Sequence, residues 1–191
     1  STEQDKKRIL ELRELLNKYN YNYYIKNAPT VSDYEFDTLL NELIDLEAKY
    51  PDMNDPNSPT VRVGGFASST FESVLHPVQL GSLQDVFDKA GIIDFHRKVI
   101  EKISNPLYVV EPKIDGLSVA LEYRNGEFYR GATRGDGLVG EDVSENLRTI
   151  ASVPLTLPEK LPRLIVRGEV FMPINSFNSL VEEQELNGEE P

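Results

Sequence analysis

The spacing of apolar residues changes partway along this chain of 191 residues, and that change limits the folds that the chain can adopt. Up to Tyr50, apolar residues recur at three- and four-residue steps, as on the buried face of a helix. Beyond residue 106 they mostly alternate with polar residues, as in strands that bury one face. The stretch 51–70 between them is rich in Pro, Asn, Asp, Ser and Gly and predicts a linker. We expect an α+β protein with a helical domain at 1–65 and a second domain at 66–191.

The first helical stripe ends before Pro29, and the second begins at a marked helix cap. Ser32 and Glu35 have the spacing of a capping box, in which each side chain accepts a hydrogen bond from the other residue's backbone N–H. Pro51 ends the second helix, and two helices with a short connection predict a helical hairpin. The apolar residues expected between the helices are Ile9, Leu12, Leu16, Tyr19 and Tyr23 in the first, and Phe36, Leu39, Leu40, Leu43, Leu46 and Tyr50 in the second.

The pattern of the second domain predicts a mostly antiparallel sheet with helices beside it. Its clearest signal is Asn125-Gly126 between two alternating segments, because this dipeptide favours a two-residue hairpin turn. The ranges expected as strands are 107–113, 117–123, 127–133 and 163–171. Helices are expected at 85–103 and 173–186, the latter followed by the stop signal Asn187-Gly188.

Composition excludes several classes of function. The formal net charge of −12 argues against this stretch holding nucleic acid by itself, because such binding needs clustered positive charge. The lack of cysteine excludes disulfides and a thiolate zinc site, and two histidines are too few for a histidine-rich metal centre. No apolar run reaches the length of a membrane span, and the charged N-terminus is unlike a signal peptide. A monomeric cytoplasmic protein without a membrane partner is expected.

The stretch from Glu111 to Gly116 reads Glu-Pro-Lys-Ile-Asp-Gly and places Lys113 between two carboxylates. Side chains alternate along a strand, so Glu111 and Lys113 would project from the same face. A lysine attacks only as the neutral amine, which requires burial or a nearby charge that favours loss of its proton. The alternative is a solvated surface ion pair, worth about 0–1 kcal/mol.

Three other groups of residues each allow a structural and a functional interpretation. Arg167 and Glu169 share one face of the strand expected at 163–171, as an exposed sheet face or as the lining of a cleft. The glycine-rich stretch 131–137, which contains Arg134, suits contact with phosphate or sugar oxygens, or is an ordinary turn.

The third group lies at the end of the first helix, where four tyrosines cannot all face one core. Tyr23 continues the apolar stripe and is expected to pack in the core, whereas the remaining rings could stack on a flat ligand. Asp33 and Asp37 complement the dipole of the second helix, or bind a positively charged ring.

Lys113-Ile-Asp-Gly matches the K-x-D-G motif of the covalent nucleotidyltransferases, and the whole chain resembles the bacterial NAD-dependent DNA ligases. The stretches that carry this resemblance, in order, are 27–29, Ser32-Asp33, Phe36-Asp37, Ser82-Leu83, Val86-Phe87, 111–118, 132–137, 140–142 and 166–171.

The resemblance implies that Lys113 attacks the α-phosphate of NAD, expels nicotinamide mononucleotide (NMN) and keeps AMP on its nitrogen. Asp115 is implied to orient or deprotonate the lysine and to influence Mg²⁺. The whole enzyme then passes AMP to the 5′-phosphate of a DNA nick, where the 3′-hydroxyl displaces it during replication and repair. The residues implied to bind NAD are Glu111, Ser82 and Leu83 near adenine, Arg134 and Glu169 near the nucleotide and ribose, and Tyr23, Tyr24, Asp33, Phe36 and Asp37 at the NMN half.

The chain departs from the family pattern in two ways. Tyr24 stands where the family often has histidine, and Phe36, where it often has tyrosine, could serve only as a hydrophobic staple with Val31. The later family segments that hold nicked double-stranded DNA and Zn²⁺ do not follow Pro191, so a fragment with part of the adenylation domain is expected. The alternatives are an ATP-using nucleotidyltransferase, or a fragment that binds nucleotide without turnover.

Overall fold

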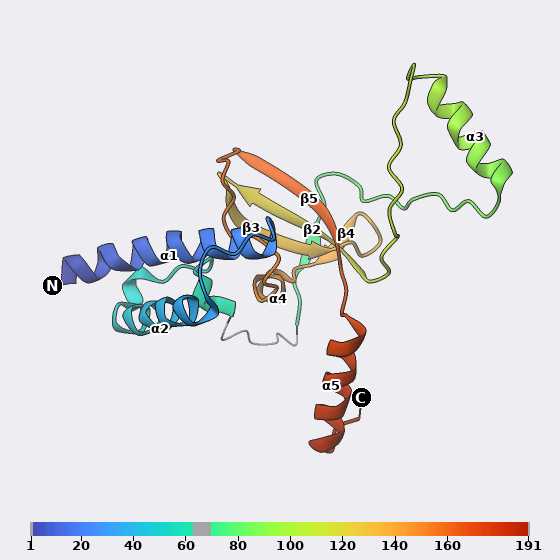
Figure 1. Cartoon of the computed structure of the whole chain (residues 1–191). Helices are drawn as coiled ribbons and strands as arrows, with labels where there is room; N and C mark the ends of the chain where they lie inside the picture. The colour runs from blue at the N-terminus through green and yellow to red at the C-terminus, as the bar shows by residue number, and fades with distance from the viewer. Residues whose placement is uncertain (1, 63–69, 191) are drawn as a thin grey trace.

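A computed structural model describes residues 2–62 and 70–190, which form a helical hairpin and a sheet domain (Figure 1). The expected α+β class is confirmed. The helices are α1 (Thr2–Tyr24), α2 (Asp33–Lys49), α3 (Lys89–Ile100), α4 (Ser144–Arg148) and α5 (Ile174–Leu186), with short 3-10 turns η1 (Pro51–Met53) and η2 (Pro59–Arg62). The strands are β1 (Ser73–Leu75), β2 (Leu117–Arg124), β3 (Glu127–Thr133), β4 (Val139–Glu141) and β5 (Arg163–Val170).

The hairpin of α1 and α2 closes around one apolar cluster, as its spacing predicts. Its centre is fully buried and consists of Ile9, Leu12, Leu16 and Leu43, flanked by Tyr19, Phe36, Leu39, Leu40, Leu46, Tyr50 and Met53. The capping box at Ser32 and Glu35 is present and fixes the start of α2. Tyr23 is half exposed and lies outside this cluster, so the expectation that it packs in the core was wrong. Helix α1 ends at Tyr24, and Asn27 then takes a left-handed conformation that cannot continue the helix.

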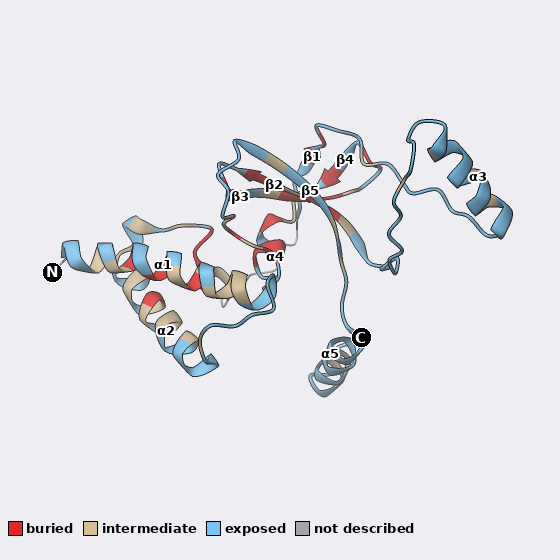
Figure 2. Cartoon of the chain, turned by 45° about the horizontal axis from the view of Figure 1, so that its top comes forward, coloured by how far each residue is buried: buried red, intermediate tan, exposed pale blue. Residues whose placement is uncertain are grey.

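The central strand of the sheet domain is β2, which pairs antiparallel with β3 on one side and β5 on the other. Asn125 and Gly126 both have positive φ, which confirms the two-residue turn predicted between β2 and β3. Strands β1 and β4 form a separate small antiparallel pair. One face of the large sheet covers the core, which consists of Val119, Tyr123, Phe128, Leu147, Val153 and Leu155. Helices α3 and α5 are largely exposed (Figure 2).

The strand expected at 107–113 is absent, although its residues have strand-forming character. No strand among the described residues pairs with this segment, and Leu107 and Val110 are 98% and 96% exposed. A strand is stable only when a neighbour satisfies its backbone hydrogen bonds. Alternation of side chains along the sequence does not reveal whether a partner strand is present.

Residues 54–62, which we call the bridge segment, are folded where the sequence predicts a linker. The bridge segment hydrogen-bonds to α2 through Ser58 and to the sheet domain through Asn57 and Arg62. The predicted Gly64-Gly65 part of the linker lies outside the described residues. Within 2–62 and 70–190, no helix has the length and apolar character that a membrane span requires.

A buried carboxylate organises the far end of the sheet. Glu122 is 5% exposed and accepts hydrogen bonds from Arg124 at 3.0 Å, Arg163 at 2.9 Å and Arg130 at 3.4 Å. Burial alone would raise the pKa of Glu122, but the hydrogen bonds and charges of Arg124 and Arg163 outweigh it and hold the pKa below its ordinary 4.5.

Glu122→Gln should lower the free energy of unfolding by about 1–2 kcal/mol at pH 7, because three partly exposed guanidinium groups lose their counter-charge. The folded pKa lies below the unfolded one, so this stabilisation is present above pH 4.5 and is lost as the pH falls through the folded pKa. Urea titrations at several pH values measure the difference. Glu127→Gln is the control, since its ion pair with Lys160 is exposed. A difference between wild type and Glu122→Gln that does not shrink in acid would contradict this account.

Candidate functional site

The predicted NMN-binding residues gather in one cavity of about 390 Å³ within the hairpin. Tyr23 and Tyr24 come from the last turn of α1, and their rings meet edge to face with centroids 4.7 Å apart. Asp33, Phe36 and Asp37 come from the first turns of α2. The remaining lining residues, which were not among the predicted NMN-binding residues, are Tyr19, Asn20, Pro29, Thr30, Val31 and Ser32.

Local helix geometry explains how these side chains meet. Asn20 precedes Tyr23 and Tyr24 by three and four residues, so the three share one side of α1, a spacing that could have identified Asn20. Asp33 and Asp37 are likewise four residues apart on α2, whose start is fixed by the capping box at Ser32. The cavity therefore combines aromatic faces with two carboxylates, which suits a flat ligand that carries positive charge.

A second set of predicted residues lies on the sheet domain, where Arg134 and Ser82 meet. The Arg134 Nη2 donates to Ser82 Oγ at 3.0 Å. Ser82 is held there through Leu80, whose backbone N–H donates to the Gly137 carbonyl at 2.9 Å. Gly137 has a φ of +94°, and a Cβ at this position would lie 2.8 Å from the Leu80 carbonyl oxygen. The glycine-rich loop therefore fixes the approach of the Ser82 segment.

Arg167 extends this set along β5. Its Nε donates to Ser118 Oγ at 3.3 Å, and its Nη1 donates to the Gly81 carbonyl. Glu169 lies opposite Ser118 in the strand register and shares the face of Arg167. Arg134 Nε is buried without a hydrogen-bond partner among the described residues. Arg167 was recognised from sequence as a charged strand residue but was not included in the predicted NAD-binding set.

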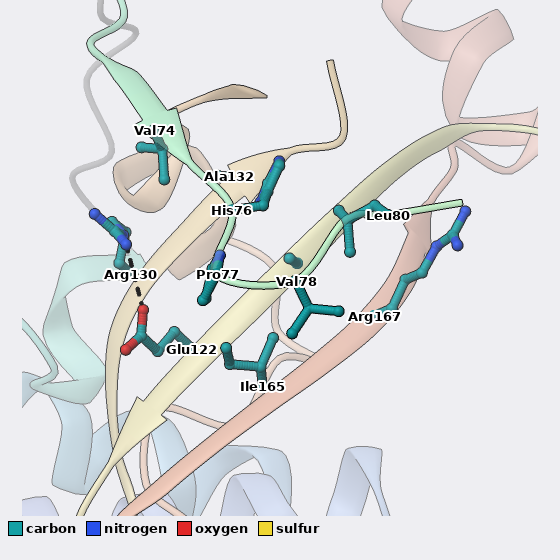
Figure 3. A pocket seen from close by; sticks show the side chains of 11 residues that line it. Val74, His76, Pro77, Val78, Leu80, Glu122, Arg130, Ala132, Ile165 and Arg167 are labelled. Carbon is teal, nitrogen blue, oxygen red and sulfur yellow. Dashed lines mark hydrogen bonds and ion pairs between the residues drawn. The ribbon is translucent and has the colours of Figure 1, made fainter. Parts of the chain in front are cut away.

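The same sheet face contains a largely apolar cavity of about 300 Å³ (Figure 3). Arg167 stands at one end and the ion-paired Glu122 and Arg130 at the other. His76 forms part of the wall, with its Nε2 2.9 Å from the Thr133 carbonyl oxygen, so this nitrogen carries the donated proton. Short strand β1 and the segment after it supply five of the eleven lining residues, which is why sequence periodicity did not reveal the cavity.

Lys113 lies on the exposed segment that leads into β2, apart from both cavities. Lys113 makes no hydrogen bond or ion pair with the described residues, and Glu111, Asp115 and Leu83 are also exposed. The segment is anchored at Gly116, where a Cβ would lie only 2.2 Å from the Val170 carbonyl oxygen of β5. The backbone of β5 therefore approaches this glycine closely. The structure brings Lys113 next to the start of the sheet but not against Glu111.

The described residues contain no cluster of three or more His, Cys, Asp or Glu side chains that could hold a metal ion. Mg²⁺ in nucleotide enzymes is commonly held by one or two carboxylates together with substrate phosphates. A single exposed Asp115 beside Lys113 fits that kind of site, because the nucleotide would supply the remaining ligands.

Two protein-family models together match nearly the whole chain. Residues 2–64 match the DNA ligase-like N-terminal NAD⁺-binding domain, and residues 68–191 match the NAD-dependent DNA ligase adenylation domain. The chain is 53% identical over 185 residues to a DNA ligase of Acetivibrio thermocellus and 55% identical over 188 residues to one of Caldicellulosiruptor bescii. These alignments cover 96% and 97% of this chain but 28% of each relative. The chain therefore belongs to the NAD-dependent DNA ligases.

Proposed function

We propose that this chain performs the NAD-dependent adenylation step of a DNA ligase, with Lys113 as the nucleophile. The observation that carries the proposal is the separation of two chemically different sites within one chain. The hairpin cavity has aromatic rings and carboxylates, while the sheet face near Lys113 has guanidinium groups. NAD has a cationic nicotinamide ring and an anionic pyrophosphate, so each site suits one part of the molecule.

In the proposed step, Lys113 Nζ attacks the phosphorus of the adenylyl group. A P–N bond forms, the P–O bond to NMN breaks, and the lysine nitrogen loses its proton. Asp115 is two residues away and is our candidate to accept that proton or to orient the amine. Arg134 and Arg167 would hold phosphate oxygens, and Glu169 the ribose. Phosphoryl transfer depends mainly on such placement and charge neutralisation.

The NMN half is proposed to lie in the hairpin cavity. Asp33 and Asp37 would balance the charge on nicotinamide, and Tyr23, Tyr24 and Phe36 would contact its ring. The carboxylates of this cavity complement a cationic ring, which NAD has and ATP lacks. The charge of the cavity therefore favours NAD over the ATP alternative. Mg²⁺, when bound through the nucleotide phosphates and Asp115, would neutralise charge on the pyrophosphate.

The chain spans about 28% of the length of the relatives it matches, so nick sealing is proposed for the whole protein. There, AMP would pass from Lys113 to the 5′-phosphate of nicked DNA, and the 3′-hydroxyl would displace it. Because the chain has a net charge of −12, we propose that other segments of the whole protein bind the DNA. A cytoplasmic location and a monomeric state are part of this proposal.

A second candidate is nucleotide binding by this chain without turnover. The exposed Lys113, which has no hydrogen-bond or ion-pair partner among the described residues, favours it, because no side chain of the described residues orients the amine for attack. Mass measurement of the chain after incubation with NAD and Mg²⁺ separates the two, since only turnover leaves AMP on the protein.

Lys113→Arg in the full-length protein should abolish covalent AMP attachment from NAD, because a guanidinium stays charged and cannot attack. Intact-protein mass spectrometry measures the adduct. Lys102→Arg changes another exposed lysine of the sheet domain and should leave the adduct unchanged. An AMP adduct of normal yield on the Lys113→Arg protein would refute the assignment of the nucleophile.

Asp33→Asn and Asp37→Asn should each raise the KM for NAD in AMP attachment by about 10-fold to 100-fold, the effect of losing one charge-assisted contact. Asp45→Asn, on an exposed position of the same helix outside the cavity, is the matched control. Single-turnover rates over a range of NAD concentrations provide the measurement. Equal KM values for all three variants and the wild type would remove the hairpin cavity from NAD recognition.

A further inference from the structure

Three arginine side chains converge on the buried Glu122 at the end of β2 that lies away from Lys113. Arg124 and Arg163 both donate through Nε to the same carboxylate oxygen, Glu122 Oε1, at 3.0 and 2.9 Å. Arg130 donates from Nη2 to the other oxygen at 3.4 Å (Figure 3). One carboxylate therefore faces three guanidinium groups, and this arginine cluster keeps an excess of two positive charges.

The arginine cluster retains unused hydrogen-bond donors. Glu122 occupies the Nε atoms of Arg124 and Arg163, and no Nη atom of these two side chains has a hydrogen-bond partner within residues 2–62 and 70–190. The two arginine side chains are 47% and 49% exposed, so a ligand can reach them. The paired N–H groups of a guanidinium match two oxygens of a phosphate, which makes phosphate the ligand that best fits this cluster.

A bulge in β3 helps to hold Arg124 in place. The pairing of β2 with β3 shifts register after Glu122, which leaves Tyr129 as the extra residue of the bulge. The Arg124 Cζ lies 3.6 Å from the centroid of the Tyr129 ring. A guanidinium that is already held by a ring and a carboxylate loses less conformational freedom when a ligand binds.

The need to pair a buried carboxylate explains only part of the arginine cluster. One guanidinium is enough to balance the charge of Glu122, and further exposed arginine side chains add little to stability. Close by, Lys160 pairs with Glu127 at 3.1 Å, and Glu159 adds one carboxylate, so the positive excess is reduced to one but keeps its sign. In a chain with a net charge of −12, such a local excess points to an anionic ligand.

The arginine cluster lies on the sheet face that carries the candidate nucleotide site. Side chains two residues apart along a strand share a face, so Arg163, Arg167 and Glu169 project from the same face of β5. The six steps from Glu169 to Arg163 span about 20 Å of strand. A DNA duplex rises about 3.4 Å per base pair, so about six base pairs cover that length.

The proposed function brings a DNA nick to this face. AMP passes from Lys113 to the 5′-phosphate of the nick, so the nick must lie at the nucleotide site near Glu169. A nicked duplex extends in both directions from the nick, and an arm that follows the direction of β5 passes the arginine cluster. The position of the cluster therefore suits contact with the DNA backbone.

We propose that Arg124 and Arg163 bind a backbone phosphate of the nicked duplex within about six base pairs of the nick. This inference rests on the proposed function, which places the nick at the nucleotide site. Other segments of the whole protein supply most of the DNA affinity, and the arginine cluster adds one contact from the chain that carries Lys113. Phosphate contacts fix the register of a duplex without reading its sequence, so this contact aligns the nick with the nucleotide site.

The first test measures the dissociation constant of the full-length protein for a nicked duplex, without NAD and Mg²⁺ so that no sealing occurs. The double variant Arg124→Gln/Arg163→Gln should bind about fivefold or more weakly, and the slope of log Kd against log salt concentration should fall by about one. The double variant Arg124→Lys/Arg163→Lys keeps both charges but loses the paired N–H groups. It should bind with intermediate affinity and an unchanged salt slope.

The matched control is Arg97→Gln/Lys98→Gln on α3. These two exposed side chains also share one carboxylate, Asp94, at 3.4 and 2.9 Å, and they lie outside the arginine cluster. An affinity and a salt slope that change no more in Arg124→Gln/Arg163→Gln than in this control would overturn the proposal. Urea unfolding shows whether each variant folds, and the lysine variant provides the test if the glutamine variant does not, because it keeps the counter-charge of Glu122.

The second test locates the contact on the DNA. Single uncharged methylphosphonate linkages are placed at each position within about six base pairs of the nick, on both strands. One or two adjacent positions should weaken binding by the wild-type protein, and the same positions should weaken binding less in Arg163→Gln. Equal losses in the two proteins at every position would show that Arg163 contacts no phosphate in this range and would overturn the proposal.

The outcomes separate this proposal from the proposed function. If the wild-type protein gains AMP from NAD while the arginine variants bind DNA as the control does, the phosphate contact is overturned and the adenylation step stands. If the wild-type protein gains no AMP while the arginine variants bind DNA more weakly than the control, the adenylation step is overturned and the phosphate contact is supported.

Discussion

The backbone pairing of β2 with both neighbours is the constraint on which the rest of the structure depends. The pairing runs the full length of β2 against β5, from Leu117 opposite Val170 to Arg124 opposite Arg163. One face of β2 covers the apolar core, and the other carries the polar residues beside Arg167 and Glu169. The beginning of the strand anchors the Lys113 segment at Gly116, and near its end Tyr123 holds the segment that accepts hydrogen bonds from the bridge segment. A single strand therefore sets the positions of both candidate sites.

The two candidate sites also differ in the charge of their side chains. The chain is strongly acidic, yet guanidinium groups face the sheet side while carboxylates line the hairpin cavity. This arrangement matches a substrate whose two halves differ in charge, and it reduces the chance that either half binds in the wrong place. In the proposed function, separate units recognise the two halves of NAD, so the position of one unit relative to the other would become part of the chemistry.

Local patterns predicted the elements that are stabilised locally. The capping box at Ser32, the Asn125-Gly126 turn and the apolar stripes of α1 and α2 depend on neighbours within a few residues, and each formed as expected except for Tyr23 at the end of the α1 stripe. The strand expected at 107–113 depends on a distant partner, and that information is not in its own sequence. The same limit applied to the bridge segment, whose composition is that of a linker but whose Asn57 and Arg62 meet carbonyls about 70 to 90 positions further along the chain.

In the candidate site, too, the features set by local spacing were predicted and those set by distant contacts were not. The five hairpin residues predicted from family resemblance share one cavity, because helix spacing brings them together. Ser82 and Arg134 also meet, through the glycine-rich loop. Tyr23 was expected to pack in the core, and the apolar cavity beside Arg167 was not foreseen, because burial depends on short strands and distant contacts that periodicity does not encode.

The most direct test of the two-site account is to map ligand binding residue by residue. Backbone amide NMR spectra of the isotope-labelled chain would be recorded with NMN alone and with AMP alone. The account predicts that NMN shifts resonances of α1 and α2 around Tyr24 and Asp33, while AMP shifts those around Ser82, Arg134 and Glu169. Shifts from NMN confined to the sheet domain, or from AMP confined to the hairpin, would contradict the account.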